Sequence, residues 1–249
     1  MNEFDINPNR SLNTLPTIVR FASGEISTTP HQVCRYAGGT GYKMNIEIAS
    51  LVPKILRSAR RLITPALVYA IYPVSKFLAD GTLILQDKFS LVLPPHERDA
   101  LTRYIAVVVC TIGKMLETTS HHLSKQRKFL ESIFLDAAGV ALTEALSERA
   151  YDLISHKAEN ENLSVGCRFA PGYAEMPLSN QTLLFNLVDG AAIGVKLNTR
   201  LVMDPSKSLS FFIRLTESKT FLRGEYKCEL CPVSDCNFRI RRAYASQRR

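Results

Sequence analysis

Apolar residues recur along the chain in two patterns, one helical and one extended. Over residues 44–62 they fall three and four positions apart, as on one face of a helix, with basic side chains between them. Residues 104–112 form an unbroken apolar run that ends at Gly113, which is typical of a strand buried on both faces. The longest helical pattern covers residues 129–154. Its candidate core positions are Leu135, Leu142, Leu146 and Leu153.

Shorter patterns complete the predicted elements. Further strands are predicted at residues 66–73, 82–85, 89–92, 194–201 and 208–215, and further helices at residues 114–124 and 178–187. Because a proline turn at residues 204–207 separates the last two strands, we expect them to form a hairpin-like unit. Strands, then helices, then strands, without regular alternation, predict an α+β fold with an antiparallel or mixed sheet flanked by helices.

The two ends of the chain differ from its centre. Residues 1–36 are polar and rich in turn residues, and we interpret them as an N-terminal extension. The net charge of the whole chain is +8, but its last 13 residues hold five arginines and no acid, which leaves +3 over the first 236 residues. The body is therefore only mildly basic. A basic tail suits an acidic partner, and no interleaving of aromatic and basic residues supports a nucleic-acid partner.

Composition narrows the class of protein. The chain has 249 residues, of which 46% are hydrophobic and 22% charged, the mix of a soluble globular protein of one or two domains. Its longest apolar stretch, residues 62–74, contains Pro65 and Pro73 and is shorter than the roughly 20 residues of a membrane-spanning helix. The N-terminal residues lack the basic and apolar regions of a secretion signal. We therefore expect a cytoplasmic protein that makes no membrane contact.

Six cysteines are unevenly spaced, which favours thiols or a metal over disulfides. Three of them, Cys228, Cys231 and Cys236, lie within nine residues near the C-terminal end and are our candidate metal ligands. Three thiolates suit a zinc ion or an iron–sulfur cluster. A redox-active pair of Cys228 with Cys231, or free thiols, are the alternatives. Cys110 falls in the buried apolar run, where an inert thiol is expected.

Three segments of the chain carry distinctive motifs. The first begins with the buried run through Gly113 and continues into the helix with the sequence Thr-Glu-Ala-Leu-Ser-Glu at residues 143–148. The second is Arg-Phe-Ala-Pro-Gly-Tyr at residues 168–173. The third covers residues 193–210 and contains Met-Asp-Pro-Ser-Lys-Ser-Leu-Ser. Taken together and in this order, the three segments resemble the activation domain of vitamin B12-dependent methionine synthase, whose Arg-x-x-Pro-Gly-Tyr signature the second segment matches. The resemblance is strongest over residues 100–215.

The resemblance implies a function that uses S-adenosylmethionine. Family members support the reductive methylation of cob(II)alamin, so that a cobalamin methyltransferase regains activity; S-adenosylmethionine supplies the methyl group and an external donor the electron. Here the resemblance implies a stand-alone reactivation protein and a partial component of methionine synthase activity rather than a complete enzyme. Its expected partners are a corrinoid methyltransferase, which carries the cobalamin, and an electron donor such as a flavodoxin or ferredoxin.

The resemblance also assigns a binding site. It places Arg168 on the carboxylate of the methionine moiety, a role that suits a planar guanidinium. Ala170 would offer backbone groups to the ligand, and Gly172 would allow the turn that brings Tyr173 beside it. Tyr173 is the expected catalytic residue, because its counterpart approaches the upper face of the cobalamin. Glu144 is the expected contact for the ligand's ammonium or hydroxyl groups.

The family pattern is incomplete in this chain. Ala174 stands where a proline usually follows the Gly-Tyr pair, and Arg-Leu-Thr-Glu at residues 214–217 replaces the family's adenine-flanking tyrosines. This motivates an alternative function, a metal, iron–sulfur or thiol redox protein on the same scaffold that passes electrons to a corrinoid protein. We expect an extension at residues 1–36, an activation-domain-like α+β domain at 37–222, and a Cys-rich basic tail at 223–249.

Overall fold

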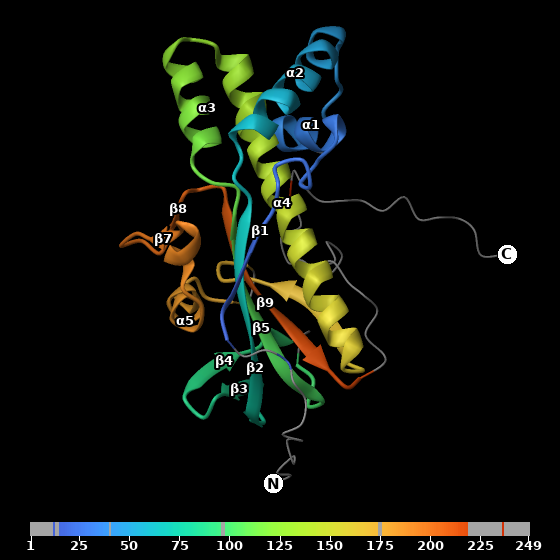
Figure 1. Cartoon of the computed structure of the whole chain (residues 1–249), viewed down its shortest axis with the longest axis vertical. Coiled ribbons are helices and arrows are strands. Elements are labelled where there is room, and N and C mark those ends of the chain that lie inside the picture. The colour runs from blue at the N-terminus through green and yellow to red at the C-terminus, as the bar shows by residue number, and fades with distance from the viewer. Residues whose placement is uncertain are drawn as a thin grey trace, which may run out of the picture.

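A sheet built from distant parts of the chain organises the protein (Figure 1). The computed structural model describes residues 12, 15–39, 41–95, 98–173, 176–218 and 236. Within these residues, seven strands form an antiparallel sheet in the order β4-β3-β2-β5-β9-β6, with β1 beside the first half of β2. The strands are β1 (Thr17–Arg20), β2 (Ala66–Phe77), β3 (Thr82–Leu85), β4 (Phe89–Val92), β5 (Thr102–Thr111), β6 (Ser164–Phe169) and β9 (Ser208–Thr216). The predicted α+β architecture is confirmed.

Helices cover both faces of this sheet. The helices are α1 (Pro30–Gly38), α2 (Ile46–Leu62), α3 (Met115–Lys125), α4 (Phe129–Asn160) and α5 (Asn180–Leu187). α1, α2 and α3 pack around α4, whose lower half lies along one face of the sheet. α5 and the short 3-10 helix Gly190–Ile193 cover the other face, beside a small ribbon of β7 (Lys196–Leu197) and β8 (Met203–Asp204). The side-chain oxygen of Asn45 accepts a hydrogen bond from the Ile48 N–H at 2.9 Å and so caps the start of α2.

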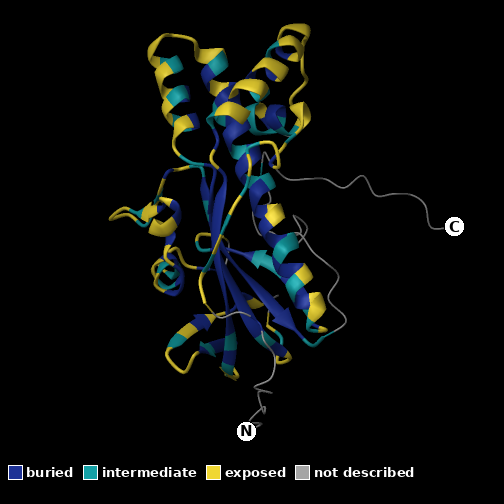
Figure 2. Cartoon of the chain, in the orientation of Figure 1, coloured by how far each residue is buried: buried dark blue, intermediate teal, exposed yellow. Residues whose placement is uncertain are grey.

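The apolar run at the centre of the chain occupies the middle of the sheet, as predicted. Successive residues of β5 alternate between two hydrophobic clusters: Ala106, Val108 and Cys110 face α4, whereas Ile105, Val107 and Val109 face the α5 side. β9 alternates in the same way, with Phe211 toward α4 and Phe212 toward α5. The central strands are therefore buried on both sides, as the dark ribbons in Figure 2 show.

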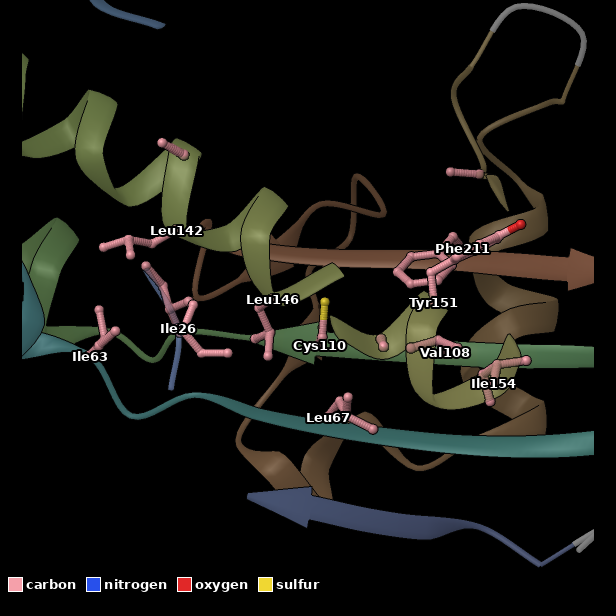
Figure 3. Packing of buried hydrophobic residues seen from close by; sticks show 14 of the residues in the cluster. Ile26, Ile63, Leu67, Val108, Cys110, Leu142, Leu146, Tyr151, Ile154 and Phe211 are labelled. Atoms are coloured by element: carbon pink, nitrogen blue, oxygen red, sulfur yellow. The ribbon is translucent and has the colours of Figure 1, made fainter. Parts of the chain in front are cut away.

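Helix α4 carries the larger of the two contacts with the sheet. Figure 3 shows Leu142, Leu146 and Ile154 of α4 in the same apolar layer as Val108 and Phe211. The helix extends beyond the predicted end at residue 154 to Asn160, and of its four candidate core positions only Leu153 is not fully buried. A Cβ atom at Gly139 would lie 2.6 Å from Leu116 Cδ2, so this glycine permits α3 to approach closely. Lys207, which precedes β9, forms a 2.8 Å ion pair with Asp136 of α4.

The predicted hairpin-like unit is wrong. The segment at residues 194–201 contributes only β7, which pairs with β8, while β9 pairs with β5 and β6 on either side. The turn at residues 204–207 leads from the ribbon into the main sheet and contains a cis peptide bond before Pro205. β9 is recruited to the sheet because its alternating apolar residues complete both core clusters, which the small ribbon could not do.

The N-terminal segment contains regular structure of its own. β1 pairs with β2 in antiparallel register, from Thr17 opposite Tyr69 to Arg20 opposite Ala66. α1 packs against α4, begins after a capping Thr29 and buries Val33 and Cys34. The proposed limits of the N-terminal extension and of the C-terminal tail stay predictions. No helix among the described residues is long and apolar enough to cross a bilayer.

A buried ion pair fastens the second half of β9. Arg214 has no exposed surface, and its Nη1 lies 2.8 Å from Oδ2 of Asp99, a side chain that is 13% exposed. The hydroxyl of Thr216 donates to the same oxygen at 2.7 Å. Because Asp99 precedes β5, the pair joins the two central strands from the α5 side of the sheet.

We expect Asp99→Asn to lower the free energy of unfolding by about 3–5 kcal/mol, because it removes a negative charge that lies 2.8 Å from a buried guanidinium. Denaturant titration monitored by circular dichroism measures the change. Lys114→Ala is the control: it removes the Lys114–Asp204 ion pair, whose side chains are 60% and 61% exposed, and should have a much smaller effect on stability because solvent screens this pair. Similar losses in the two variants would show that burial does not determine the contribution of the Arg214 pair.

Candidate functional site

A hollow opens where α4, β6 and β9 meet. Its lining includes four of the five predicted binding residues: Glu144, Arg168, Ala170 and Tyr173. The lining is completed by Leu209, Ser210 and Phe211 of β9. The empty space amounts to about 490 Å³, including the part that opens to solvent. The fold thus brings together residues that are separated by as many as 67 positions in the chain.

Helix α4 presents one side to the hollow. Glu144, Ser147 and Tyr151 are spaced by three and four residues, so they lie along the same side of the helix. The Tyr151 hydroxyl donates to the backbone oxygen of Gly166 in β6 at 2.9 Å, which fixes the helix against this strand. Ser147 is fully buried, and its hydroxyl lies 2.8 Å from the Glu144 backbone oxygen. The same spacing therefore directs Glu144 toward the neighbouring strand.

Strand β6 supplies the guanidinium of the site. Arg168 pairs with Ile213 across the β6–β9 ladder, after a register shift that follows Val165. Its Nη1 donates to the Ser147 hydroxyl, and its Nη2 lies 3.9 Å from Oε2 of Glu144. Its guanidinium carbon lies 5.7 Å from the centre of the Phe211 ring, within range of a cation–π interaction. Arg168 is thereby held from the helix on one side and from β9 on the other.

The loop after β6 forms the rim of the hollow. The Tyr173 N–H donates to the Ala170 oxygen at 3.1 Å, and the Gly172 N–H donates to the Met176 oxygen at 2.9 Å. Gly172 has a φ of +87°, a conformation that glycine adopts without strain, as predicted for this turn. Gly172 shapes the loop but is not among the residues that line the hollow. Tyr173 is 53% exposed, so its ring lies at the mouth of the hollow.

The negative charge of Glu144 contributes to a raised pKa in two nearby tyrosines, Tyr173 and Tyr36. Partial desolvation, with the Glu144 charge, raises the pKa of Tyr173 above its ordinary value, although the nearby Arg168 opposes this. Burial and, to a smaller extent, the negative charge of Glu144 raise the pKa of Tyr36 in α1 to about 12. Both phenols are therefore neutral hydrogen-bonding groups at physiological pH. α1 lies against α4, which brings Tyr36 close to this charged side of the helix.

The geometry suits a ligand that carries both charges. A guanidinium offers parallel donors to a carboxylate, and the adjacent glutamate is a matching acceptor for an ammonium group. Because both line the hollow within 3.9 Å of each other, they suit a zwitterionic amino acid group rather than a simple anion. Tyr173 at the mouth adds a flat apolar face and a hydroxyl.

The predicted metal ligands fall mostly outside the described residues. Cys228 and Cys231 are not described, and Cys236 is partly buried. Among the residues that the structure does describe, no group of three metal-binding side chains gathers in one place. The metal-binding prediction therefore stays a prediction. Cys110 is fully buried on β5, and burial raises the pKa of its thiol to about 12, as expected of an inert cysteine.

Sequence reasoning missed Ser147 and Tyr36. Ser147 lies three residues after Glu144, and this helical spacing was an available signal. Tyr36 lies in the segment interpreted as an extension, and no sequence pattern connects it with α4. Leu209 and Ser210 belong to the third motif, but the sequence assigned them no role in the site.

We expect Glu144→Gln to lower the pKa of both Tyr173 and Tyr36, because the negative charge that disfavours their phenolates is removed. NMR titration of labelled tyrosine rings, assigned with Tyr173→Phe and Tyr36→Phe, measures both values. Glu159→Gln near the end of the same helix should change neither. Unchanged tyrosine titration in Glu144→Gln would contradict the placement of this carboxylate.

Comparison with known proteins identifies the family. The sequence model of the vitamin B12-dependent methionine synthase activation domain matches residues 91–229, more than half of the chain. This range contains every residue that lines the hollow. A comparison with curated proteins found no match to the chain.

Solved structures agree on the fold. A crystal structure of the MetH reactivation domain bound to AdoHcy superimposes with a TM-score of 0.60. The two sequences are 15% identical, and the superposition covers 84% of this chain and 81% of the other. At this identity the likeness establishes the architecture, while the family assignment rests on the sequence match. The chain belongs to the activation-domain family of vitamin B12-dependent methionine synthase.

Proposed function

We propose that this protein binds S-adenosylmethionine in the hollow and thereby supports the reactivation of a cobalamin-dependent methyltransferase. The observation that carries the proposal is the Arg168–Glu144 pair, which lies beside Tyr173 inside the part of the chain that matches the family. The AdoHcy bound to the structurally similar reactivation domain supports the same ligand class. AdoHcy is what remains of S-adenosylmethionine after its methyl group has been transferred.

The chain's own residues bind and orient the ligand. Arg168 would pair with the ligand's α-carboxylate through two parallel hydrogen bonds, and Glu144 would accept from its ammonium group. The backbone of Ala170 and the β9 segment Leu209–Phe211 would line the path toward the adenosine. Anchoring the amino acid end in this way fixes the direction in which the sulfonium methyl points.

The partner would approach from the side of Tyr173. The exposed Tyr173 lines the hollow, and Leu178, which is 45% exposed, lies beside the neighbouring Gly172. Cobalamin, carried by the partner protein, would accept the methyl group together with one electron from a donor such as a flavodoxin or ferredoxin. A neutral Tyr173 could donate a hydrogen bond across this interface. The protein is then a component of the methyltransferase system that presents the methyl donor.

We expect the full chain to bind S-adenosylhomocysteine saturably and Arg168→Ala to weaken the binding about 10- to 100-fold, the effect of losing a hydrogen bond to a charged group. Isothermal titration calorimetry measures both affinities. Arg103→Ala is the matched control, because Arg103 also lies on a strand and forms a 2.8 Å ion pair with a glutamate, Glu217. Neither residue lines the hollow. No binding at millimolar ligand, or equal binding by Arg168→Ala, would reject the proposed site.

Reactivation itself is tested with a methionine synthase from which the activation domain has been removed. We expect the cob(II)alamin signal in electron paramagnetic resonance to decay faster when the chain, S-adenosylmethionine and a reductant are all present. Arg168→Ala should slow this decay, because less methyl donor is bound at a given concentration. If the decay proceeds equally without the chain, the protein has no part in reactivation.

A further inference from the structure

One buried hydroxyl contacts both charged groups of the site. Ser147 has no exposed surface, and its hydroxyl lies within hydrogen-bonding distance of both Arg168 and Glu144. Its oxygen accepts a hydrogen bond from Arg168 Nη1 and lies 3.4 Å from Oε2 of Glu144 and 2.8 Å from the Glu144 backbone oxygen. A serine hydroxyl has one proton and two lone pairs, so it can accept from the guanidinium while it donates its proton to the Glu144 backbone oxygen, the nearer of the two acceptors.

The direct contact between the charged groups is correspondingly loose. Arg168 Nη2 and Glu144 Oε2 are 3.9 Å apart, longer than the 2.7–2.9 Å that is usual for a charge-assisted hydrogen bond. Both side chains remain partly accessible, at 20% for Arg168 and 31% for Glu144. Two opposite charges at this separation attract each other, and the attraction strengthens as water is excluded. Some other contact must hold them apart for both to face a ligand.

Ser147 is placed to provide this contact. It engages Nη1 and draws that edge of the guanidinium toward the helix, while the Phe211 ring supports the guanidinium from β9 at 5.7 Å. Without the hydroxyl, Arg168 would be free to rotate about its long side chain and close on Glu144. The resulting internal ion pair would compete with the carboxylate and the ammonium of a zwitterionic ligand.

We infer that Ser147 is a positioning residue: its hydroxyl holds Arg168 and Glu144 apart, in the arrangement that recognises the amino acid end of the ligand. This inference rests on the proposed function and adds a specificity to it. Ligands with an α-amino acid group depend on Ser147, and nucleoside thioethers without that group do not. Ser147 acts through its two neighbours and has no role in the chemistry of methyl transfer.

The test compares two ligands that differ by this group. S-adenosylhomocysteine carries the amino acid end, and 5′-methylthioadenosine keeps the adenosine and the sulfur but lacks it. We expect Ser147→Ala in the full chain to weaken S-adenosylhomocysteine binding about 10-fold or more, as for other hydrogen bonds to charged groups, with unchanged affinity for 5′-methylthioadenosine. Isothermal titration calorimetry measures the ratio of the two affinities.

Control variants separate positioning from a general loss of structure. Ser155→Ala is matched, because Ser155 is also buried on α4 and its hydroxyl donates to a backbone oxygen, that of Tyr151, at 2.9 Å. It should leave both affinities unchanged. Ser147→Cys replaces the hydroxyl with a weak hydrogen-bonding group of similar size and should reproduce the selective loss. Ser147→Cys decides the question if Ser147→Ala does not fold.

The outcomes distinguish the inference from the proposed function. A selective loss of S-adenosylhomocysteine affinity supports the inference. If the wild-type chain binds S-adenosylhomocysteine and the Ser147 variants bind it equally well, or lose both ligands to the same degree, the positioning role is wrong while the proposed function stands. If the wild-type chain binds neither ligand, the proposed function fails and the inference fails with it.

Discussion

Burial of β5 and β9 on both faces is the constraint from which the rest of the structure follows. A strand whose side chains are apolar on both faces requires an apolar layer against each face. Here α4 supplies one layer, and α5 with the short helix after it supplies the other. Because β9 lies between β5 and β6, the helix that covers β5 also reaches β6. The position of α4 over these strands is therefore fixed by packing and not by the site.

The site is a by-product of this packing and of one helical spacing. Tyr151 fixes α4 to β6 through the Gly166 oxygen, and the residues one and two turns earlier then meet Arg168. Phe211 belongs to the core cluster and at the same time supports the guanidinium. A change in the core beneath β9 would therefore alter the separation of charges in the hollow. The stability of the sheet and the geometry of the site share the same residues.

Two of the arginines that lie on strands, Arg214 and Arg168, are held in different ways. Arg214 is fully buried and pairs with Asp99 at 2.8 Å, which satisfies its charge within the fold. Arg168 is partly accessible and faces a carboxylate at 3.9 Å through an intervening hydroxyl. Removing the partner of a buried arginine leaves an uncompensated charge in the fold, whereas an arginine held near an acid without a tight contact can still pair with the carboxylate of a ligand. Separation and burial thus distinguish the structural arginine from the candidate binding residue.

The sequence by itself was sufficient for the fold class, for several central elements and for the turn at the rim of the hollow, but it did not predict β1, α1 or β6. The apolar run of β5, the helical spacing of α4 and the turn at Gly172 are local patterns, so they could be predicted from neighbouring residues. The motifs at residues 143–148 and 168–173 also indicated Glu144, Arg168 and Tyr173. Three features could be seen only in the folded protein. β9 lies within the main sheet, between β5 and β6, and not in the predicted hairpin. Ser147 contacts both Arg168 and Glu144, and Tyr36 lies near Glu144. These facts depend on contacts between distant residues, which are selected by the burial of two core faces at once and leave no periodic trace in the sequence.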